Sequence, residues 1–238
     1  LSTVTPTGVA FASSTKVQYR AHHPWATDSE CLIKMDSDEK IDLLAAGDGW
    51  FAVSTTLKRL RIFMGSGLET AIFAIPQRPM TMVGGGNLLG IIFGHSLNDD
   101  LSYMLLDVRT RQELASGNLP ISPPIKWIGI ENRTFYVLGN RILYALIQDF
   151  GHQFVPVCDV QPKNAEENES FWCVGIEEQQ LWGVILGNGR EEPEPITNLT
   201  LKALDIEPQT VEEASRNYIM KRIDYCNSAR QDKEQLGI

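Results

Sequence analysis

The sequence lacks long apolar runs and closely spaced cysteines, and each shortage argues against a class of protein. Its longest apolar stretches are far shorter than the roughly 20 residues of a membrane-spanning helix, so no membrane-spanning helix is expected. No basic region followed by an apolar one comes after Leu1, so no signal peptide is expected. The four cysteines (Cys31, Cys158, Cys173 and Cys226) contain no Cys-x-x-Cys pair and are interpreted as core residues, with a Cys158–Cys173 disulfide as the open alternative.

Basic residues are also scarce. The chain carries 21 Lys and Arg against 30 Asp and Glu, a net charge of −9 with a pI of about 5.0. The densest basic stretch is Lys58–Arg61, whose charges a strand would divide between two faces as solvated side chains. Nucleic-acid-binding domains usually present a basic face, so this chain is not expected to bind DNA directly, whatever a longer protein does elsewhere.

What the chain does contain is a recurring hairpin, with an apolar run, a tight turn and a second apolar run. Successive turns are separated by roughly 40, 38, 46 and 46 residues, the period of a four-stranded propeller blade. The pattern predicts an all-β propeller. The predicted turns are Thr7-Gly8, Asp48-Gly49, Gly85-Gly86, Glu131-Asn132 and Glu177-Glu178.

The second repeat is the clearest. Its predicted strands are 41–46, 50–55, 60–63 and 69–75, the last stopped by Pro76. The first repeat contains only two predicted strands, 9–12 and 16–19, so it is interpreted as starting in mid-blade. The other predicted strands are 80–83, 88–93, 102–108 and 112–115, then 127–130, 134–138, 142–147 and 154–160, and finally 172–176, 180–186 and 199–204.

After Pro208 the apolar spacing becomes helical. Thr210 and Glu213 form a capping box, and one amphipathic helix is expected from about Val211 to Asn227. The expected domains are therefore a propeller over 1–208 and the start of a helical domain over 209–238. Because a half-blade start implies a missing blade, the chain is expected to be a fragment of a larger protein.

Three groups of residues suggest chemistry, and each has a simpler interpretation. Gly84–Asn87 is followed by a strand rather than a helix, so it is a hairpin turn and not a phosphate loop. His22 and His23 would point to opposite faces and have no nearby ligands, so no metal site is expected. His95 and His152 stand alone in loops, and no Gly-x-Ser-x-Gly motif occurs.

Carboxylates and tryptophans bear on whether the propeller is an enzyme. Asp42 is the only charged residue of the second inner strand, and Met80 to Val83 has none, so a propeller hydrolase is the least favoured hypothesis and no catalytic residue is assigned. Trp25, in a loop, is the best candidate for an exposed contact. The tryptophans beside the hairpins are expected to pack between blades; they are Trp50, Trp127, Trp172 and Trp182.

Several segments, in this order and spacing, resemble one known family. They are Ala46–Thr55 with Leu60–Phe63, Trp127–Gly129, Phe154–Cys158, Phe171–Ile176, Glu212-Glu213 and Ile223–Tyr225. The chain resembles, most strongly from about Leu43 to Asp205, the SepB-type propeller of the replisome hub family. This family comprises the WD-repeat and HMG-box DNA-binding proteins of animals and the fungal chromosome-transmission-fidelity and minichromosome-loss proteins.

The resemblance implies a six-bladed propeller that assembles as a homotrimer in the nucleus, without enzymatic activity or cofactor. In the family, a helical domain after the propeller captures short peptides and links the helicase GINS subcomplex to DNA polymerase α-primase. Compared with the full family pattern, this chain is expected to lack the WD40 domain, the opening blade, the HMG box and most of the helical domain, so no partner-binding residue is carried over. The alternative hypothesis is a monomeric WD40-like propeller that binds another peptide or a histone tail by its central face.

Overall fold

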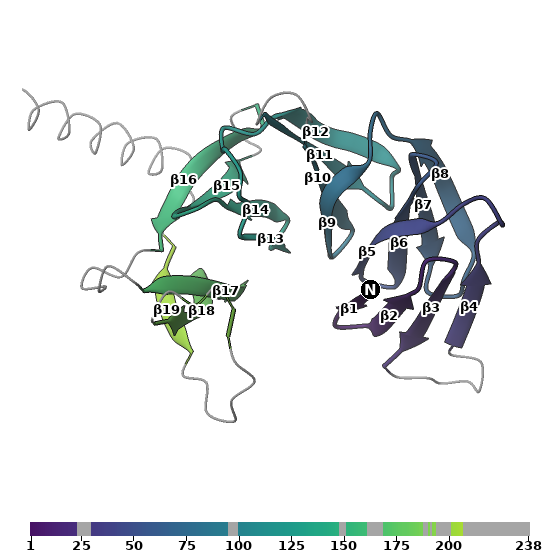
Figure 1. Cartoon of the computed structure of the whole chain (residues 1–238), viewed down its shortest axis with the longest axis horizontal. Helices are drawn as coiled ribbons and strands as arrows, with labels where there is room; N and C mark the ends of the chain where they lie inside the picture. Colours follow the sequence, from purple (N-terminus) through teal and green to yellow (C-terminus); the bar gives the residue numbers. More distant parts are fainter. Residues whose placement is uncertain are drawn as a thin grey trace, which may run out of the picture. The chain divides into compact units, whose positions relative to one another are not determined.

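The computed structural model describes residues 1–22, 30–94, 100–147, 151–160, 169–187, 190, 192–193 and 201–206 (Figure 1). Within these ranges the secondary structure consists of strands and turns, and no helix there is long and apolar enough to cross a membrane. The chain divides into two compact units, Leu1–Phe135 and Tyr136–Ile238, whose boundary falls inside β14. The helix expected at Val211 to Asn227 lies outside the described residues.

The described strands form sheets in which each strand lies beside the next one in the chain. Four sheets have four strands, and the fifth has three described strands. This up-and-down order is that of propeller blades, which confirms the all-β class and the four-stranded repeat. A total of six blades remains a prediction.

The strand boundaries agree closely with the predicted ones from residue 41 to residue 186. The first sheet is β1 (Ser2–Val4), β2 (Gly8–Ala12), β3 (Lys16–Ala21) and β4 (Glu30–Lys34); the second is β5 (Ile41–Gly47), β6 (Trp50–Thr55), β7 (Arg59–Met64) and β8 (Glu69–Ala74). The third is β9 (Pro79–Gly85), β10 (Leu88–Gly94), β11 (Leu101–Asp107) and β12 (Gln112–Asn118). The fourth is β13 (Trp127–Glu131), β14 (Thr134–Leu138), β15 (Ile142–Ile147) and β16 (Gln153–Asp159), and the last is β17 (Ser170–Glu177), β18 (Gln180–Leu186) and β19 (Lys202–Asp205).

The interpretation of the first repeat as a half-blade was wrong. Strand β1 pairs with β2 through Val4 and Val9, and β4 pairs with β3 through Cys31 and Tyr19, so the first sheet has all four strands. Both missed strands are short, and the ends of β4 are the charged residues Glu30 and Lys34.

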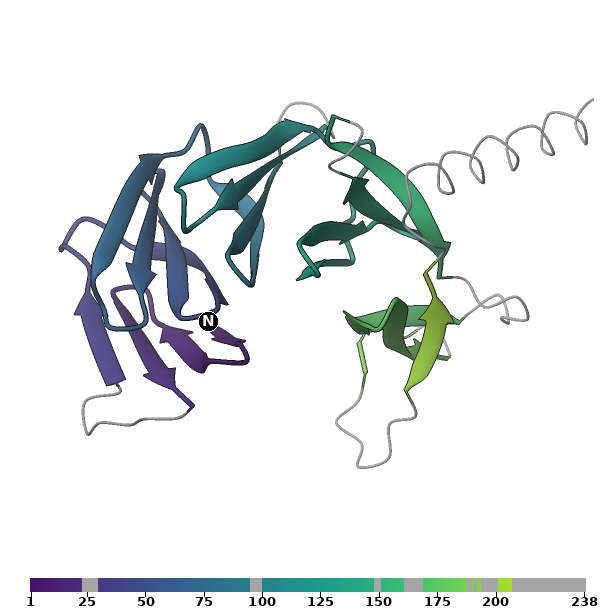
Figure 2. The ribbon, with the colours of Figure 1, turned by 180° about the vertical axis from the view of Figure 1, so that it is seen from behind.

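In the first unit, the second sheet packs between the first and the third. Every residue of β6 is buried, as expected for a strand covered on both faces. The inner strands β1, β5, β9 and β13 of consecutive sheets lie side by side, as the view from behind in Figure 2 also shows. One core joins the first and second sheets; its buried members include Ala10, Val17, Tyr19, Phe51, Val53 and Phe63. Another joins the second and third; its buried members include Trp50, Ala52, Ile62, Met82, Ile91 and Phe93.

Three hairpin turns lie one residue later than predicted: Gly86-Asn87 between β9 and β10, and two turns that contain no glycine. Asn132 and Arg133 connect β13 to β14 with φ angles of 47° and 64°, and Glu178 and Gln179 connect β17 to β18 with 50° and 63°. Two consecutive left-handed residues characterise the tight turn whose twist matches that of the flanking strands. These turns therefore support the hairpin pattern even without glycine.

Candidate functional site

The inner ends of four consecutive sheets surround a cavity of about 420 Å³ in the first unit. Each sheet contributes the turn between its two innermost strands, and these turns converge because the inner strands run side by side. We call this the hairpin cavity. Its lining residues are Val4 to Pro6, Ala46 to Asp48, Gly84 to Asn87 and Ile130 to Arg133.

Glycine at the cavity wall allows neighbouring sheets to approach closely. A Cβ atom added at Gly84 would lie 2.2 Å from the carbonyl oxygen of Ala46, and one added at Gly85 would lie 2.8 Å from the side chain of Ile130. Gly86 has a left-handed φ of 55° in the turn itself. The run Gly84–Asn87 is thus the β9–β10 hairpin and a close-packing surface, which confirms the hairpin prediction.

Hydrogen bonds to one carbonyl fix the second sheet against the third. The oxygen of Gly86 accepts from the backbone N–H of Asp48 at 2.9 Å and from the indole Nε1 of Trp50 at 2.7 Å. Trp50 is 2% exposed and belongs to the core between these sheets. The prediction that Trp50 packs between blades is confirmed.

A threonine makes the corresponding connection between the first and second sheets. The hydroxyl of Thr7 accepts from the backbone N–H of Gly49 at 2.9 Å and donates to the carbonyl of Gly47 at 3.4 Å. It also lies 3.3 Å from the hydroxyl of Tyr19. No local sequence pattern indicates this contact, because it joins residues about 40 positions apart.

The charged groups of the hairpin cavity are few. Asp48 and Glu131 line it, as does Arg133, whose guanidinium lies 4.0 Å from a carboxylate oxygen of Asp107. Asp107 also accepts from the backbone N–H groups of Arg109 and Thr110, each at 2.9 Å, so its role is to hold a turn. No cluster of His, Cys, Asp and Glu suited to a metal ion occurs in the part of the chain that the structure describes.

Two of the histidines singled out in the sequence, His22 and His152, are described, and both lie in loops. His22 Nε2 lies 2.9 Å from the carbonyl oxygen of Thr5, which explains it as a loop contact. His152 has a left-handed φ of 61° just before β16. His23, Trp25 and His95 lie outside the described residues.

The described cysteines are free thiols, so the alternative of a Cys158–Cys173 disulfide was wrong. Burial raises the pKa of Cys173 to about 12, and burial also raises the pKa of Cys31. A thiol held in its neutral form is a poor nucleophile. Cys173 is therefore a core residue, as predicted.

The basic stretch at Lys58–Arg61 is not simply solvated. Arg61 is 14% exposed and pairs with Glu39 at 2.9 Å and with Glu69 at 2.6 Å. These acids, Glu69 first through its hydrogen bond, raise the pKa of Arg61. Glu39 is fully buried and also accepts from the hydroxyl of Thr55 at 2.8 Å. Sequence reasoning missed this network because Glu39 lies in the connection between two sheets.

The other tryptophans differ from Trp50. Trp127 is half-buried and its ring lies over Gly129, while Trp172 is 40% exposed. Trp182 is half-buried, and its indole nitrogen is buried without a hydrogen-bond acceptor among the described residues. A single structural role for all the tryptophans is therefore too simple.

Comparison with known proteins identifies the repeat. The family model described as minichromosome loss protein, Mcl1, middle region, matches residues 1–208. The mouse WD repeat and HMG-box DNA-binding protein 1 is 28% identical over 169 residues, which cover 66% of this chain and 15% of the mouse protein. Protein ENHANCER OF LHP1 1 of Arabidopsis thaliana is 23% identical over 222 residues, covering 87% of this chain and 23% of that protein.

A crystal structure of HIRA(644-1017) is similar with a TM-score of 0.48 and 12% identity, covering 67% of this chain and 55% of that one. The chain spans only 15% and 23% of the lengths of the mouse and Arabidopsis relatives. The match over residues 1–208 includes every sheet described above. The chain therefore belongs to the family of the minichromosome loss protein Mcl1 middle region.

Proposed function

We propose that this chain is the propeller of a non-enzymatic scaffold for DNA replication, which forms a homotrimer in the nucleus. The full-length protein would link the helicase GINS subcomplex to DNA polymerase α-primase through short peptide motifs, without a cofactor. The observation that carries this proposal is the family match over residues 1–208. The names of the animal relatives, which combine WD repeats with a DNA-binding HMG box, agree with it.

The physical properties of the chain suit a scaffold. A net charge of −9 disfavours nonspecific binding to DNA and favours partners with basic patches. A trimer with closed symmetry presents three copies of each docking surface, which raises the effective concentration of tethered partners. Such a trimer needs two different surfaces on each protomer, one contacting the neighbour on each side.

The test of the scaffold role is reconstitution with purified partners. The chain, extended by its natural downstream residues, would be mixed with GINS and with polymerase α-primase, separately and together, and analysed by size-exclusion chromatography. A complex containing both partners at once is expected. Formation of each binary complex without any ternary complex would contradict the linking role.

A second candidate function is supported by the hairpin cavity. A volume of about 420 Å³ that is lined by Asp48 and Glu131 is compatible with a lysine-bearing peptide such as a histone tail. A histone H3 tail peptide titrated into this chain tests it by fluorescence anisotropy. Binding that is lost in Asp48→Asn with Glu131→Gln would favour this function, and equal binding by the double variant would reject it.

A further inference from the structure

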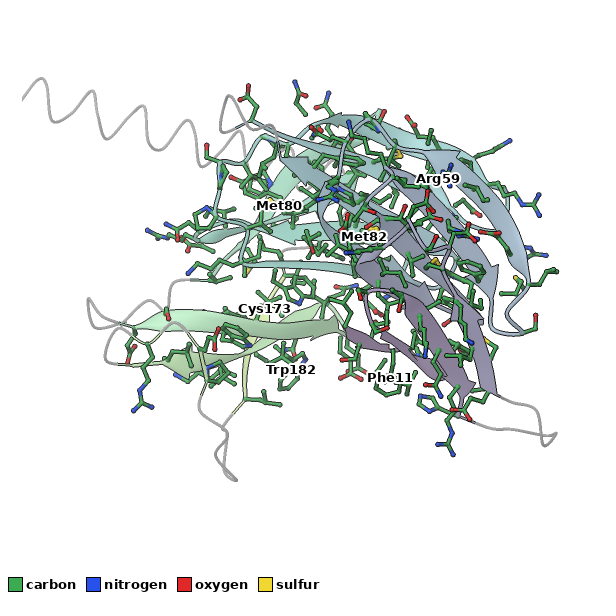
Figure 3. All side chains as sticks on the ribbon, turned by 45° about the vertical axis from the view of Figure 1, so that its right-hand side comes forward. Phe11, Arg59, Met80, Met82, Cys173 and Trp182 are labelled. Atoms are coloured by element: carbon green, nitrogen blue, oxygen red, sulfur yellow. The ribbon has the colours of Figure 1, made fainter. Side chains whose placement is uncertain are left out.

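A smaller hollow of about 210 Å³ lies at the starts of β9 and β13, at the ends of these strands away from the hairpin cavity. We call it the Met80 slot. Met80 is 51% exposed although it belongs to an inner strand (Figure 3). The lining residues are Met80, Thr81, Ile125, Lys126, Trp127 and Ile128.

The Met80 slot lies where the third sheet meets the fourth, and we call such a contact between neighbouring sheets a junction. The preceding junction, between the second and third sheets, has different side chains at the equivalent positions. Asp42 and Met80 are each the second residue of an inner strand, and each is the residue that the pairing register skips as a bulge. Arg78 immediately precedes β9, and Lys126 immediately precedes β13. Asp42 with Arg78 and Met80 with Lys126 are therefore equivalent pairs at successive junctions.

The two pairs differ in one chemical respect. At the first junction, Arg78 Nε lies 3.3 Å from the Oδ2 of Asp42, which gives an ion pair without a hydrogen bond to that oxygen among the described residues. At the next junction, methionine stands where the carboxylate would be. Within the described ranges Lys126 forms no ion pair, and it remains exposed at the edge of the slot.

The Met80 slot thus combines apolar side chains with Lys126, a cation that no acidic side chain of the described ranges pairs with. Ile125, Trp127 and Ile128 supply half-buried apolar surface, and methionine adapts to side chains of different shapes. Tryptophan is enriched among the residues that dominate binding energy. A ligand that brings both a large apolar side chain and a carboxylate would satisfy both features.

We propose that the Met80 slot binds a short extended segment of a partner protein in which a large apolar residue stands next to Asp or Glu. The apolar side chain fills the hollow, and the carboxylate takes the place that Asp42 holds at the preceding junction and pairs with Lys126. This site lies in the propeller itself and requires neither the helical domain nor trimer formation, so it goes beyond the scaffold role proposed above.

The two contributions differ in size. Burying one Leu or Phe side chain strengthens binding by a factor of about 10 to 100, whereas an exposed charge pair contributes a factor of about two to five. The slot is therefore expected to select first for the apolar residue and second for the neighbouring charge.

A library of displayed random peptides, selected on the whole chain, tests the proposal without knowledge of the partner. We expect enrichment of peptides with Leu, Phe or Met beside Asp or Glu. A fluorescein-labelled copy of the enriched peptide would then be titrated by anisotropy against wild-type and variant chains whose circular dichroism is unchanged. No enrichment of this pattern would overturn the proposal.

The decisive variant is Met80→Asp, which introduces at this junction the carboxylate that Asp42 supplies at the preceding one and should close the slot by pairing with Lys126. We expect it to weaken peptide binding about tenfold or more, and Lys126→Glu to weaken it about fivefold or more. Lys34→Glu on the exposed end of β4 is the control for Lys126→Glu, because both change the net charge by −2, and its binding should stay within about twofold of wild type. Equal binding by wild type and Met80→Asp would overturn the proposal. Met80→Asp and Lys126→Glu should leave the solution mass of the chain unchanged, which separates this test from the test of trimer formation.

Discussion

Replacing Glu39 with alanine should destabilise the first unit more than any change at a surface charge. The Glu39 carboxylate is fully buried and has two short contacts, at 2.9 Å from Arg61 and 2.8 Å from Thr55. Without it, Arg61 still pairs with Glu69, so the guanidinium keeps one partner. The hydroxyl of Thr55, which is also fully buried, loses its acceptor.

The size of the effect follows from these contacts. Losing a hydrogen bond between charged groups costs about 1.5–3 kcal/mol, and leaving a buried hydroxyl unsatisfied costs about 1–3 kcal/mol. The expected destabilisation by Glu39→Ala is therefore about 3–5 kcal/mol, the range found when one member of a buried pair is removed. Glu39→Gln keeps an acceptor for Thr55 and should cost less, about 1.5–3 kcal/mol.

The assay is urea unfolding, followed by tryptophan fluorescence and by circular dichroism, with the two transitions required to coincide. The control is Arg59→Ala, because Arg59 is 49% exposed and lies 3.7 Å from Glu39. It should cost less than about 0.5 kcal/mol. If Glu39→Ala changed the free energy of unfolding by less than about 1 kcal/mol, the contacts of Glu39 with Arg61 and Thr55 would not stabilise the first unit.

Three further predictions follow from the junctions and the core. Gly84→Ala should destabilise the first unit by about 1–3 kcal/mol, because the new Cβ would lie 2.2 Å from the Ala46 carbonyl oxygen; unchanged urea stability would contradict the close packing. Trp50→Phe removes the indole donor to Gly86 and should cost about 1–3 kcal/mol in the same assay, whereas a neutral result would mean that this bond does not hold the sheets together. Cys173 binds its proton more tightly when folded, since burial raises its pKa from 9.0 to about 12, so the free energy of unfolding should fall as the pH rises from about 9 to about 12. The free energy of unfolding should fall less in Cys173→Ala. An identical pH dependence in both proteins would refute the raised pKa of Cys173.

Much of the fold could be predicted from the sequence, because most strands are bounded by visible turns. Asp48-Gly49 between two apolar runs marks the β5–β6 hairpin without any knowledge of distant contacts. Strand β1 is only three residues long, too short for a recognisable alternation of apolar and polar residues. Its existence depends on pairing with β2, which is a tertiary contact.

The functional features were harder to predict for the same reason. The approach of Gly84 to Ala46 and the bond from Trp50 to Gly86 join different sheets, so neither appears in any local pattern. From the sequence, Met80 is predicted to be an ordinary apolar residue of a strand. Its exposure results from a bulge in the pairing register, which only the structure shows.

The measurement that tests the central proposal most directly is the solution mass of this chain by light scattering, over a wide range of concentrations and at two salt levels. The same measurement on a chain extended further along the natural protein tests whether residues outside this segment are needed for assembly. A mass near three protomers in the extended chain is predicted, and it should persist on dilution. A monomer in both chains at every concentration would contradict the trimeric scaffold.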